Sequence, residues 1–311
     1  MESIKVFAPA TVANVVCGYD VIGFAVDNPG DEVTMRISEK PGIRITKITG
    51  DDGKLSLDPQ KNTVGVSVQH FLDAIDQSRL GIEIELHKQM PIGSGLGSSA
   101  ASTVAGLFAA NQLLGDKLSL KELLPFAMKG EEIACGTGHA DNVAPALFGG
   151  FVLIRSYDPL DVIKLPYPEC LHCAIVFPDV DVPTRDARQL IRSKVLLKDA
   201  VTQWGNIAGL VSGLFMKDTN LMGRSMQDII VEPARAMLIP DFYKLREIAM
   251  QNGAISFGIS GSGPSVFSFT HHKPQAVQIS KALQEHLSAI NIKNKSYTSA
   301  INDAGPRILD T

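Results

Sequence analysis

Hydrophobic and polar residues alternate along several short segments of the chain, which is typical of strands with one buried and one hydrated face. The clearest segment is 81–87, where isoleucine or leucine at 82, 84 and 86 alternates with two glutamates and a histidine. Such a half-hydrated strand does not belong at the centre of a parallel nucleotide-binding sheet. The same reasoning predicts further strands at 4–8, 31–37, 43–48, 148–155, 171–177 and 297–301, and a hairpin within 254–270.

Other segments repeat their apolar residues every three or four positions, as amphipathic helices do. This spacing predicts helices at 63–77, 100–114, 119–135, 184–197, 199–217, 241–252 and 274–287. Ser119 and Glu122 form a capping box at the start of one of them, whereas Pro125 is expected to kink or restart that helix. Residues 136–146 contain two glycines and three polar side chains among small residues, and we expect a loop there.

Helices and half-buried strands segregate in both halves of the chain, which favours two α+β domains over one doubly wound sheet. The turn-rich segment 156–160 marks the expected boundary. We therefore predict one domain over residues 1–157 and a second over 158–311.

The amino-acid composition and the net charge exclude few classes of protein. The 311 residues are 45% hydrophobic and 20% charged, as in an ordinary globular protein. The net charge of −4 gives no reason to expect binding to nucleic acid or to an anionic membrane. The beginning of the chain lacks the shape of a signal peptide, so a cytoplasmic location is expected. Cys170 and Cys173 have the spacing of metal ligands, but no second pair matches them, and we expect core thiols.

Three glycines precede the helix predicted at 100–114. Gly93, Gly95 and Gly97 allow tight backbone turns immediately before the helix start, where free N–H groups attract anions. The hydroxyls of Ser98 and Ser99 could also bind phosphate or a metal ion. Neither Gly-x-x-x-x-Gly-Lys-Ser/Thr nor Gly-x-Gly-x-x-Gly fits this stretch. We predict a phosphate-binding loop, the alternative being a plain tight turn before a packed helix.

Glu131 occupies the middle of the apolar face of the helix predicted at 119–135. A carboxylate in that position is costly unless it is paired or holds a metal ion. The residues around it leave two interpretations open, a ligand for a metal ion and one half of a buried salt bridge.

The glycine loop resembles that of the GHMP kinases, Pro-x-x-x-Gly-Leu-Gly-Ser-Ser-Ala, which Pro91 and residues 95–100 match without a gap. Segments near the N-terminus and at 258–264 resemble the other two motifs of that superfamily, in the same order. The resemblance implies an N-terminal ribosomal-protein-like α+β domain that carries the phosphate loop, and a C-terminal ferredoxin-like α+β domain. It also implies ATP and Mg²⁺ as cofactors.

Within the superfamily, residues 8–14, 18–20, 139–145, 184–188 and 232–235 look like motifs of the homoserine kinase family. This resemblance implies ATP-dependent phosphorylation of the hydroxyl of L-homoserine, a step of threonine biosynthesis. The partner would be this small molecule, with neither nucleic acid nor membrane, and a homodimer is compatible with it.

The resemblance also suggests roles for individual residues. Arg188 and Arg235 would bind the substrate carboxylate, because the guanidinium fork matches its geometry. Asp20 and Asn14 would bind the ammonium group, with His139 in the same pocket. Further predicted residues are the metal ligands Ser99 and Glu131, Asn142 beside the reacting hydroxyl, Asn62 and Lys88 at the adenine, and the ATP-binding Pro91, Ile92, Gly93, Ser94, Gly95, Leu96, Gly97, Ser98, Ser99, Ala100 and Ala101.

Two alternatives are a different kinase of the same superfamily and a protein of another functional class. A mevalonate-type kinase would need an aspartate base, whereas asparagine stands at position 142 and the resemblance implies a mechanism without a dedicated base. A GHMP-fold ligand sensor would bind without turnover, and the presence of both Ser99 and Glu131 speaks against it.

Overall fold

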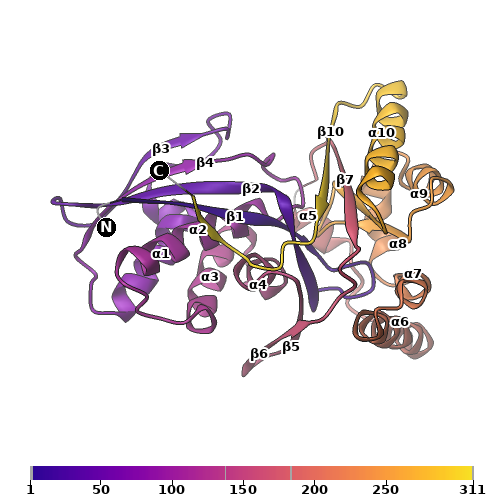
Figure 1. The fold of residues 1–311 in the computed structure, drawn as a ribbon, viewed down its shortest axis with the longest axis horizontal. Coiled ribbons are helices and arrows are strands. Elements are labelled where there is room, and N and C mark those ends of the chain that lie inside the picture. Colours follow the sequence, from indigo (N-terminus) through magenta and orange to yellow (C-terminus); the bar gives the residue numbers. More distant parts are fainter. Residues whose placement is uncertain (1–2, 137, 183, 310–311) are drawn as a thin grey trace.

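The computed structural model describes residues 3–136, 138–182 and 184–309 (Figure 1). The helices are α1 (Thr63–Ala74), α2 (Ser98–Leu113), α3 (Leu120–Cys135), α4 (Ala140–Phe148), α5 (Thr184–Gln189), α6 (Leu197–Met216), α7 (Thr219–Ser225), α8 (Glu232–Arg235), α9 (Phe242–Gln251) and α10 (Lys273–Ala289), with short 3₁₀ turns at Pro59–Lys61 and Ala236–Leu238. The strands are β1 (Ser3–Ala13), β2 (Ile22–Ser38), β3 (Ile43–Thr49), β4 (Gly81–His87), β5 (Phe151–Tyr157), β6 (Leu160–Leu165), β7 (His172–Pro178), β8 (Ser256–Ile259), β9 (Val266–Thr270), β10 (Asn294–Ala300) and β11 (Arg307–Leu309).

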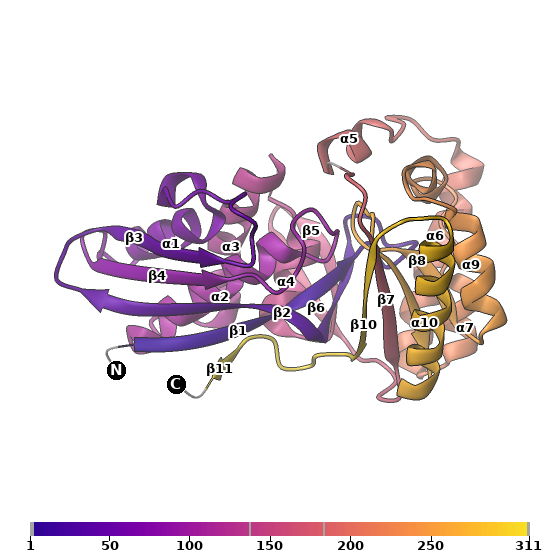
Figure 2. The ribbon, with the colours of Figure 1, turned by 90° about the horizontal axis from the view of Figure 1, so that it is seen from above.

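Over the described residues the strands form two sheets. The first has the order β11-β1-β2-β4-β3, with β5 and β6 continuing from one end of β2, and its pairs are antiparallel except β3 with β4. Helices α1 to α4 cover one face of this sheet (Figures 1 and 2). The second sheet has the order β10-β7-β9-β8, and α10 packs on β7 and β10. Its four strands follow the chain as a ferredoxin-like βαββαβ unit, which confirms the predicted two-part α+β fold.

An aromatic cluster joins the two sheets. Phe24 from β2 lies 4.9 Å, between ring centroids, from Phe151 in β5 and from Phe269 in β9, and all three side chains are fully buried. Phe267 packs edge-on against both Phe24 and Phe269. The hydrophobic core is therefore continuous from the first sheet to the second.

Most predicted elements are present, and two of the predictions about helices are wrong. The expected loop at 136–146 contains α4, because Ala140, Val143, Ala144 and Leu147 are buried at helical spacing. The helix predicted over 184–197 ends at Gln189. Helix α3 has the predicted capping box and continues through Pro125 without restarting.

One cysteine and several elements also differ from what the sequence predicted. Cys173 is buried in β7 as expected of a core thiol, but Cys170 is exposed. Strands β6 and β11 and helix α7 had not been predicted from the sequence. The hairpin of β5 and β6 crosses the boundary expected at 157 and belongs entirely to the first sheet. Strand β11 returns to pair with β1. The pairings show which strands share the first sheet, and the division of the chain after residue 157 stays a prediction.

Candidate active site

The glycine loop lies between strand β1 and the C-terminal part of the chain. Gly95 and Gly97 have positive φ angles of 78° and 63°, a region that glycine enters without strain. A Cβ on Gly97 would collide with Oγ1 of Thr11, and one on Gly95 would lie 2.6 Å from the carbonyl oxygens of Ser260 and Gly263. Glycine at these positions is therefore required by close approach as well as by the turn.

Residues 258–265 hold the loop in place. Ser260 Oγ donates a hydrogen bond to the carbonyl of Gly95 at 2.7 Å, and the N–H of Ser265 donates to the carbonyl of Ser94. On the other side, the N–H of Thr11 donates to the carbonyl of Leu96 at 3.0 Å. The loop is thus fixed before a ligand arrives and leads directly into α2, where the free N–H groups of a helix N-terminus favour an anion.

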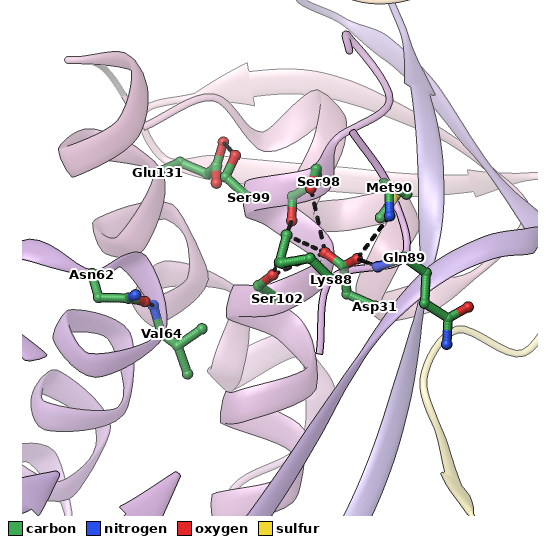
Figure 3. A network of polar contacts seen from close by, with 10 residues as sticks. All are labelled: Asp31, Asn62, Val64, Lys88, Gln89, Met90, Ser98, Ser99, Ser102 and Glu131. Atoms are coloured by element: carbon green, nitrogen blue, oxygen red, sulfur yellow. Dashed lines mark hydrogen bonds and ion pairs between the residues drawn. The ribbon is translucent and has the colours of Figure 1, made fainter. Parts of the chain in front are cut away.

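Beneath the loop lies a buried ion pair between Lys88 and Asp31, shown in Figure 3. Lys88 Nζ also donates to the carbonyl of Ser98 at 2.7 Å and to Ser102 Oγ at 2.6 Å. Asp31 accepts a further hydrogen bond from the N–H of Gln89. Burial lowers the pKa of Lys88, and the charge of Asp31 opposes that shift. These contacts hold the end of β4 against the start of α2.

Lys88 and Asn62 were predicted to contact the adenine. In the structure the Asn62 side chain accepts from the N–H of Val64 at the start of α1 and donates to the carbonyl of Ser56 (Figure 3). Both side chains are almost fully buried and engaged with other parts of the fold. Their roles at the adenine stay predictions, and their contacts show that each also stabilises a helix start.

Ser99, at the start of α2, lies beside Glu131, near the end of α3. Ser99 Oγ in α2 donates to Glu131 Oε2 in α3 at 3.1 Å, and Glu131 is only 3% exposed (Figure 3). A hydroxyl and a carboxylate fit Mg²⁺, which usually takes one or two protein oxygens and completes its shell with phosphate and water. No group of three or more His, Cys, Asp and Glu side chains within residues 3–136, 138–182 and 184–309 is arranged to hold a metal ion by itself.

A cavity of about 270 Å³ opens beside the loop and Glu131. Polar side chains from distant segments of both halves line it, and most are those predicted to bind substrate or metal: Asn14, Asp20, Ser99, Glu131, His139, Asp141, Asn142, Arg188 and Arg235. The fold therefore brings the predicted substrate-binding residues and the phosphate loop into one site.

Asp20 and Arg188, predicted to bind opposite charges of a zwitterion, pair with each other. Arg188 Nη2 lies 2.7 Å and 3.0 Å from the two carboxylate oxygens of Asp20, and also donates to the Tyr19 hydroxyl. His139 Nδ1 lies 3.8 Å from the same carboxylate, and burial lowers the pKa of His139. A zwitterion that entered between Asp20 and Arg188 would offer each of them an oppositely charged partner.

Arg235 is the most buried cation of the cavity. Its side chain is 4% exposed and lies 5.2 Å above the Tyr19 ring, and Nη1 donates to the carbonyl of Gly261 at 3.0 Å. Its Nε is buried without a hydrogen-bond partner among the described residues. Burial lowers the pKa of Arg235. A buried guanidinium with an unused donor favours an anionic ligand, because the charge is otherwise poorly compensated.

Two asparagines of the site are oriented by neighbouring groups. Asn14 donates to the carbonyl of Gly261 at 2.8 Å and accepts from the N–H of Asp20, so it shapes the turn that presents Asp20. Asn142 Oδ1 accepts from Thr11 Oγ1 at 2.8 Å. Sequence reasoning missed Thr11 as a positioning residue, although it lies within the N-terminal motif. It also missed Tyr157, whose hydroxyl donates to the carbonyl of Asp20.

Asp141 is buried in the cavity wall, and burial together with the nearby Asp20 carboxylate raises its pKa to about 7. In an unfolded chain an aspartate titrates near pKa ~3.9. Between these pKa values the folded protein keeps a proton that the unfolded chain has lost, so stability falls as pH rises through this window.

Asp141→Asn is therefore expected to raise the free energy of unfolding at pH 8 by about 1–4 kcal/mol. Urea unfolding at pH 8 and pH 4 tests this, and an equal effect at both pH values would contradict it.

Comparison with known proteins agrees with this geometry. The family models for the GHMP kinases N terminal domain and GHMP kinases C terminal match residues 62–150 and 209–289. Homoserine kinase of Chloroherpeton thalassium is 45% identical over 99% of this chain and 100% of its own length, and that of Chlorobium phaeovibrioides is 47% identical with the same coverage. The crystal structure of homoserine kinase from Cytophaga hutchinsonii is 58% identical, covers 99% of this chain and 98% of its own, and superposes with a TM-score of 0.97.

The phosphate loop between two α+β parts thus defines a small-molecule kinase of the GHMP type, which confirms the resemblance seen in the sequence motifs. The chain belongs to the GHMP kinase family and, within it, to the group of homoserine kinases. Mevalonate kinase from L. major, at 16% identity and a TM-score of 0.73, shares the fold alone. None of the helices in the described part of the chain has the length and apolar composition needed to cross a bilayer.

Proposed function

We propose that this protein transfers the γ-phosphoryl group of ATP to the hydroxyl of L-homoserine. The observation that carries this proposal is the pairing of Asp20 with Arg188, beside the buried Arg235, in the cavity next to the phosphate loop. An amino acid has the charges that these groups would bind, whereas mevalonate and sugars lack an ammonium group. The full-length relatives named homoserine kinase support the same choice.

In the proposed complex Arg235 and Arg188 hold the substrate carboxylate, and Asp20, oriented by Asn14, holds the ammonium group. Asn142, held by the hydrogen bond from Thr11 in the cavity wall, would direct the hydroxyl toward the phosphate loop. Residues 91–101 are proposed to bind ATP, its phosphates accepting from N–H groups of the residues after Pro91, and Asn62 and Lys88 are proposed to border the adenine. Ser99 and Glu131 would hold Mg²⁺, which supplies neutralisation of the phosphate charge.

Catalysis in this proposal is positioning and charge stabilisation. In phosphoryl transfer the transition state is loose, so the attacking hydroxyl can lose its proton late. Asn142 cannot accept that proton, which is consistent with a reaction that uses no dedicated base. The rigid loop supplies N–H donors toward the charge on the transferred group. The product places the enzyme in threonine biosynthesis, and we propose a cytoplasmic location.

The direct test is ATP consumption by the purified protein with homoserine, mevalonate, galactose or shikimate as acceptor. We expect turnover with homoserine and Mg²⁺, and none with the other three. Turnover of mevalonate or a sugar without homoserine would show that the substrate is wrong. Binding of homoserine without turnover of any acceptor would instead indicate a ligand sensor.

Arg235→Lys is expected to raise the KM for homoserine about ten- to hundredfold and to change the KM for ATP little. Lysine keeps the charge but loses the planar fork, and the loss of a hydrogen bond to a charged group costs about 1.5–3 kcal/mol. Steady-state kinetics with each substrate varied in turn measures both constants. A change confined to the KM for ATP would place Arg235 in the nucleotide site or in the fold.

A further inference from the structure

The turn that follows β1 has three successive residues in the left-handed backbone region. The φ angles of Asn14, Val15 and Val16 are 71°, 41° and 61°. Glycine adopts this region freely and asparagine does so at times, but a β-branched residue in it is a costly outlier. Both valines are buried, at 0% and 5% exposure, so the surrounding packing holds them in this conformation. Strained backbone of this kind gathers at functional sites, and the turn leads to Asp20 in the proposed substrate site.

The packing against Val16 comes from strand β8 in the second sheet. Gly258 lies within this strand and has no left-handed φ angle, so its backbone conformation does not require glycine. A Cβ at this position would collide with Cγ2 of Val16. Glycine at position 258 therefore leaves the space that the side chain of Val16 occupies, and the two residues are matched in size.

The segment that begins at Gly258 also supports both halves of the proposed substrate site. The carbonyl of Gly261 accepts hydrogen bonds from Asn14 Nδ2 at 2.8 Å and from Arg235 Nη1 at 3.0 Å. Oε2 of Glu232 lies 3.6 Å from the position of a Cβ on Gly258, and α8 runs from Glu232 to Arg235. One short segment thus contacts the turn that presents Asp20 and the helix that carries Arg235.

An amino-acid substrate makes the separation of these two halves important. Its ammonium and carboxylate groups are attached to the same carbon atom, so the protein groups that bind them need a fixed separation. A preorganised site has to keep its contacts within about 0.5 Å of the productive geometry. A shift of the turn on β8 would move Asn14 and Asp20 relative to Arg235, because Asn14 accepts the hydrogen bond from the N–H of Asp20.

From the strained turn and its close contact with β8, we propose that Val16 and Gly258 are positioning residues of the amino-acid site. Their packing fixes the left-handed turn and thereby the separation of Asp20 from Arg235. Both residues lie outside the lining of the cavity of about 270 Å³, so they act through the residues that they hold in place. This inference rests on the proposed function, which assigns the two charges of the substrate to Asp20 and Arg235.

A double-variant cycle at this contact tests the proposal. Gly258→Ala adds a methyl group that collides with Val16, and it is expected to raise the KM for homoserine about tenfold, as overpacking of this size does. Val16→Ala leaves a gap beside the turn and is expected to raise the same KM about fivefold. In the double variant the new methyl group fills this gap, because it would lie 3.5 Å from the remaining Cβ of residue 16. Its KM for homoserine should return to within about twofold of the wild-type value, and the KM for ATP should stay unchanged throughout.

The matched control is Gly213→Ala, which overpacks the contact between α6 and α7. A Cβ at this position would lie 2.8 Å from Cγ of Met222. The control is expected to lower the thermal stability and to leave the KM for homoserine unchanged. The same pattern in Gly258→Ala would show that the contact with Val16 is only structural, and it would overturn the proposal.

The cycle also gives a decision when one variant does not fold. If Gly258→Ala fails to fold by circular dichroism, Val16→Ala and the double variant carry the test, and equal KM values for homoserine in these two would overturn the proposal. Additive effects of the two single changes in an enzyme that uses homoserine would overturn this inference alone. A wild-type protein that does not phosphorylate homoserine would overturn the proposed function and this inference together.

Discussion

Glu131→Gln is expected to lower kcat about a hundredfold or more while the protein stays folded, since the loss of one electrostatic stabiliser typically has this effect. Glutamine keeps the size of the side chain and can still accept the hydrogen bond from Ser99 Oγ. It loses the negative charge that we propose to hold Mg²⁺ against the phosphates. The change therefore separates the chemical role of the carboxylate from its place in the packing of α3 against α2.

The measurement is kcat over a range of Mg²⁺ concentrations, with thermal unfolding as the control for the fold. We expect a weaker dependence on Mg²⁺ together with the lower kcat. Glu132→Gln is a matched control on the same helix, because Glu132 is exposed and pairs with Lys129 on the surface. Normal kcat in Glu131→Gln would show that Glu131 is a buried structural carboxylate, the other interpretation that the sequence left open.

Lys88→Met is expected to lower the free energy of unfolding by about 3–5 kcal/mol, because it leaves the charge of Asp31 buried without its partner. Both side chains of the pair are at most 2% exposed, so water cannot replace the lost ammonium. The hydrogen bonds from Lys88 to Ser98 and Ser102 would be lost with it, which loosens the start of α2 (Figure 3). The KM for ATP should therefore rise as well.

A double variant distinguishes the charge from the packing. Asp31→Asn combined with Lys88→Met removes both charges, and we expect it to recover much of the stability lost in the single variant. Urea unfolding of the wild type, both single variants and the double variant gives the coupling free energy between the two side chains. A loss below about 1 kcal/mol in Lys88→Met would show that the pair contributes little, as exposed pairs do.

The helices and strands that were predicted well have one face on the core. In α1, Val64, Val68 and Phe71 follow the helical period and are buried, and β4 has its apolar residues on the buried face. Helix α2 is different, because the sheet, α1, α3 and α4 surround it, and its alanines, its glycine, Ser98 and Ser102 are buried. The sequence pattern therefore predicted a buried face of α2 that is narrower than the one in the structure. The buried start of β2 likewise has no alternation that could reveal it.

Features that depend only on neighbouring residues could be predicted from the sequence. The positive φ angles of Gly95 and Gly97, the capping box of α3 and the place of Glu131 on a buried helix face follow from a few adjacent residues, because turns and helical faces are local. The motifs of the family also predicted which residues would gather around the loop.

Which of these side chains contact one another depends on the packing of the whole fold. Lys88 pairs with Asp31, which lies 57 positions earlier in the sequence, and Arg188 pairs with Asp20, which lies 168 positions earlier. No local pattern encodes such pairs, because the first depends on the pairing of β2 with β4 and the second on how the two parts of the chain pack together. The raised pKa of Asp141 has the same origin, since burial and the approach of Asp20 are both consequences of the complete fold.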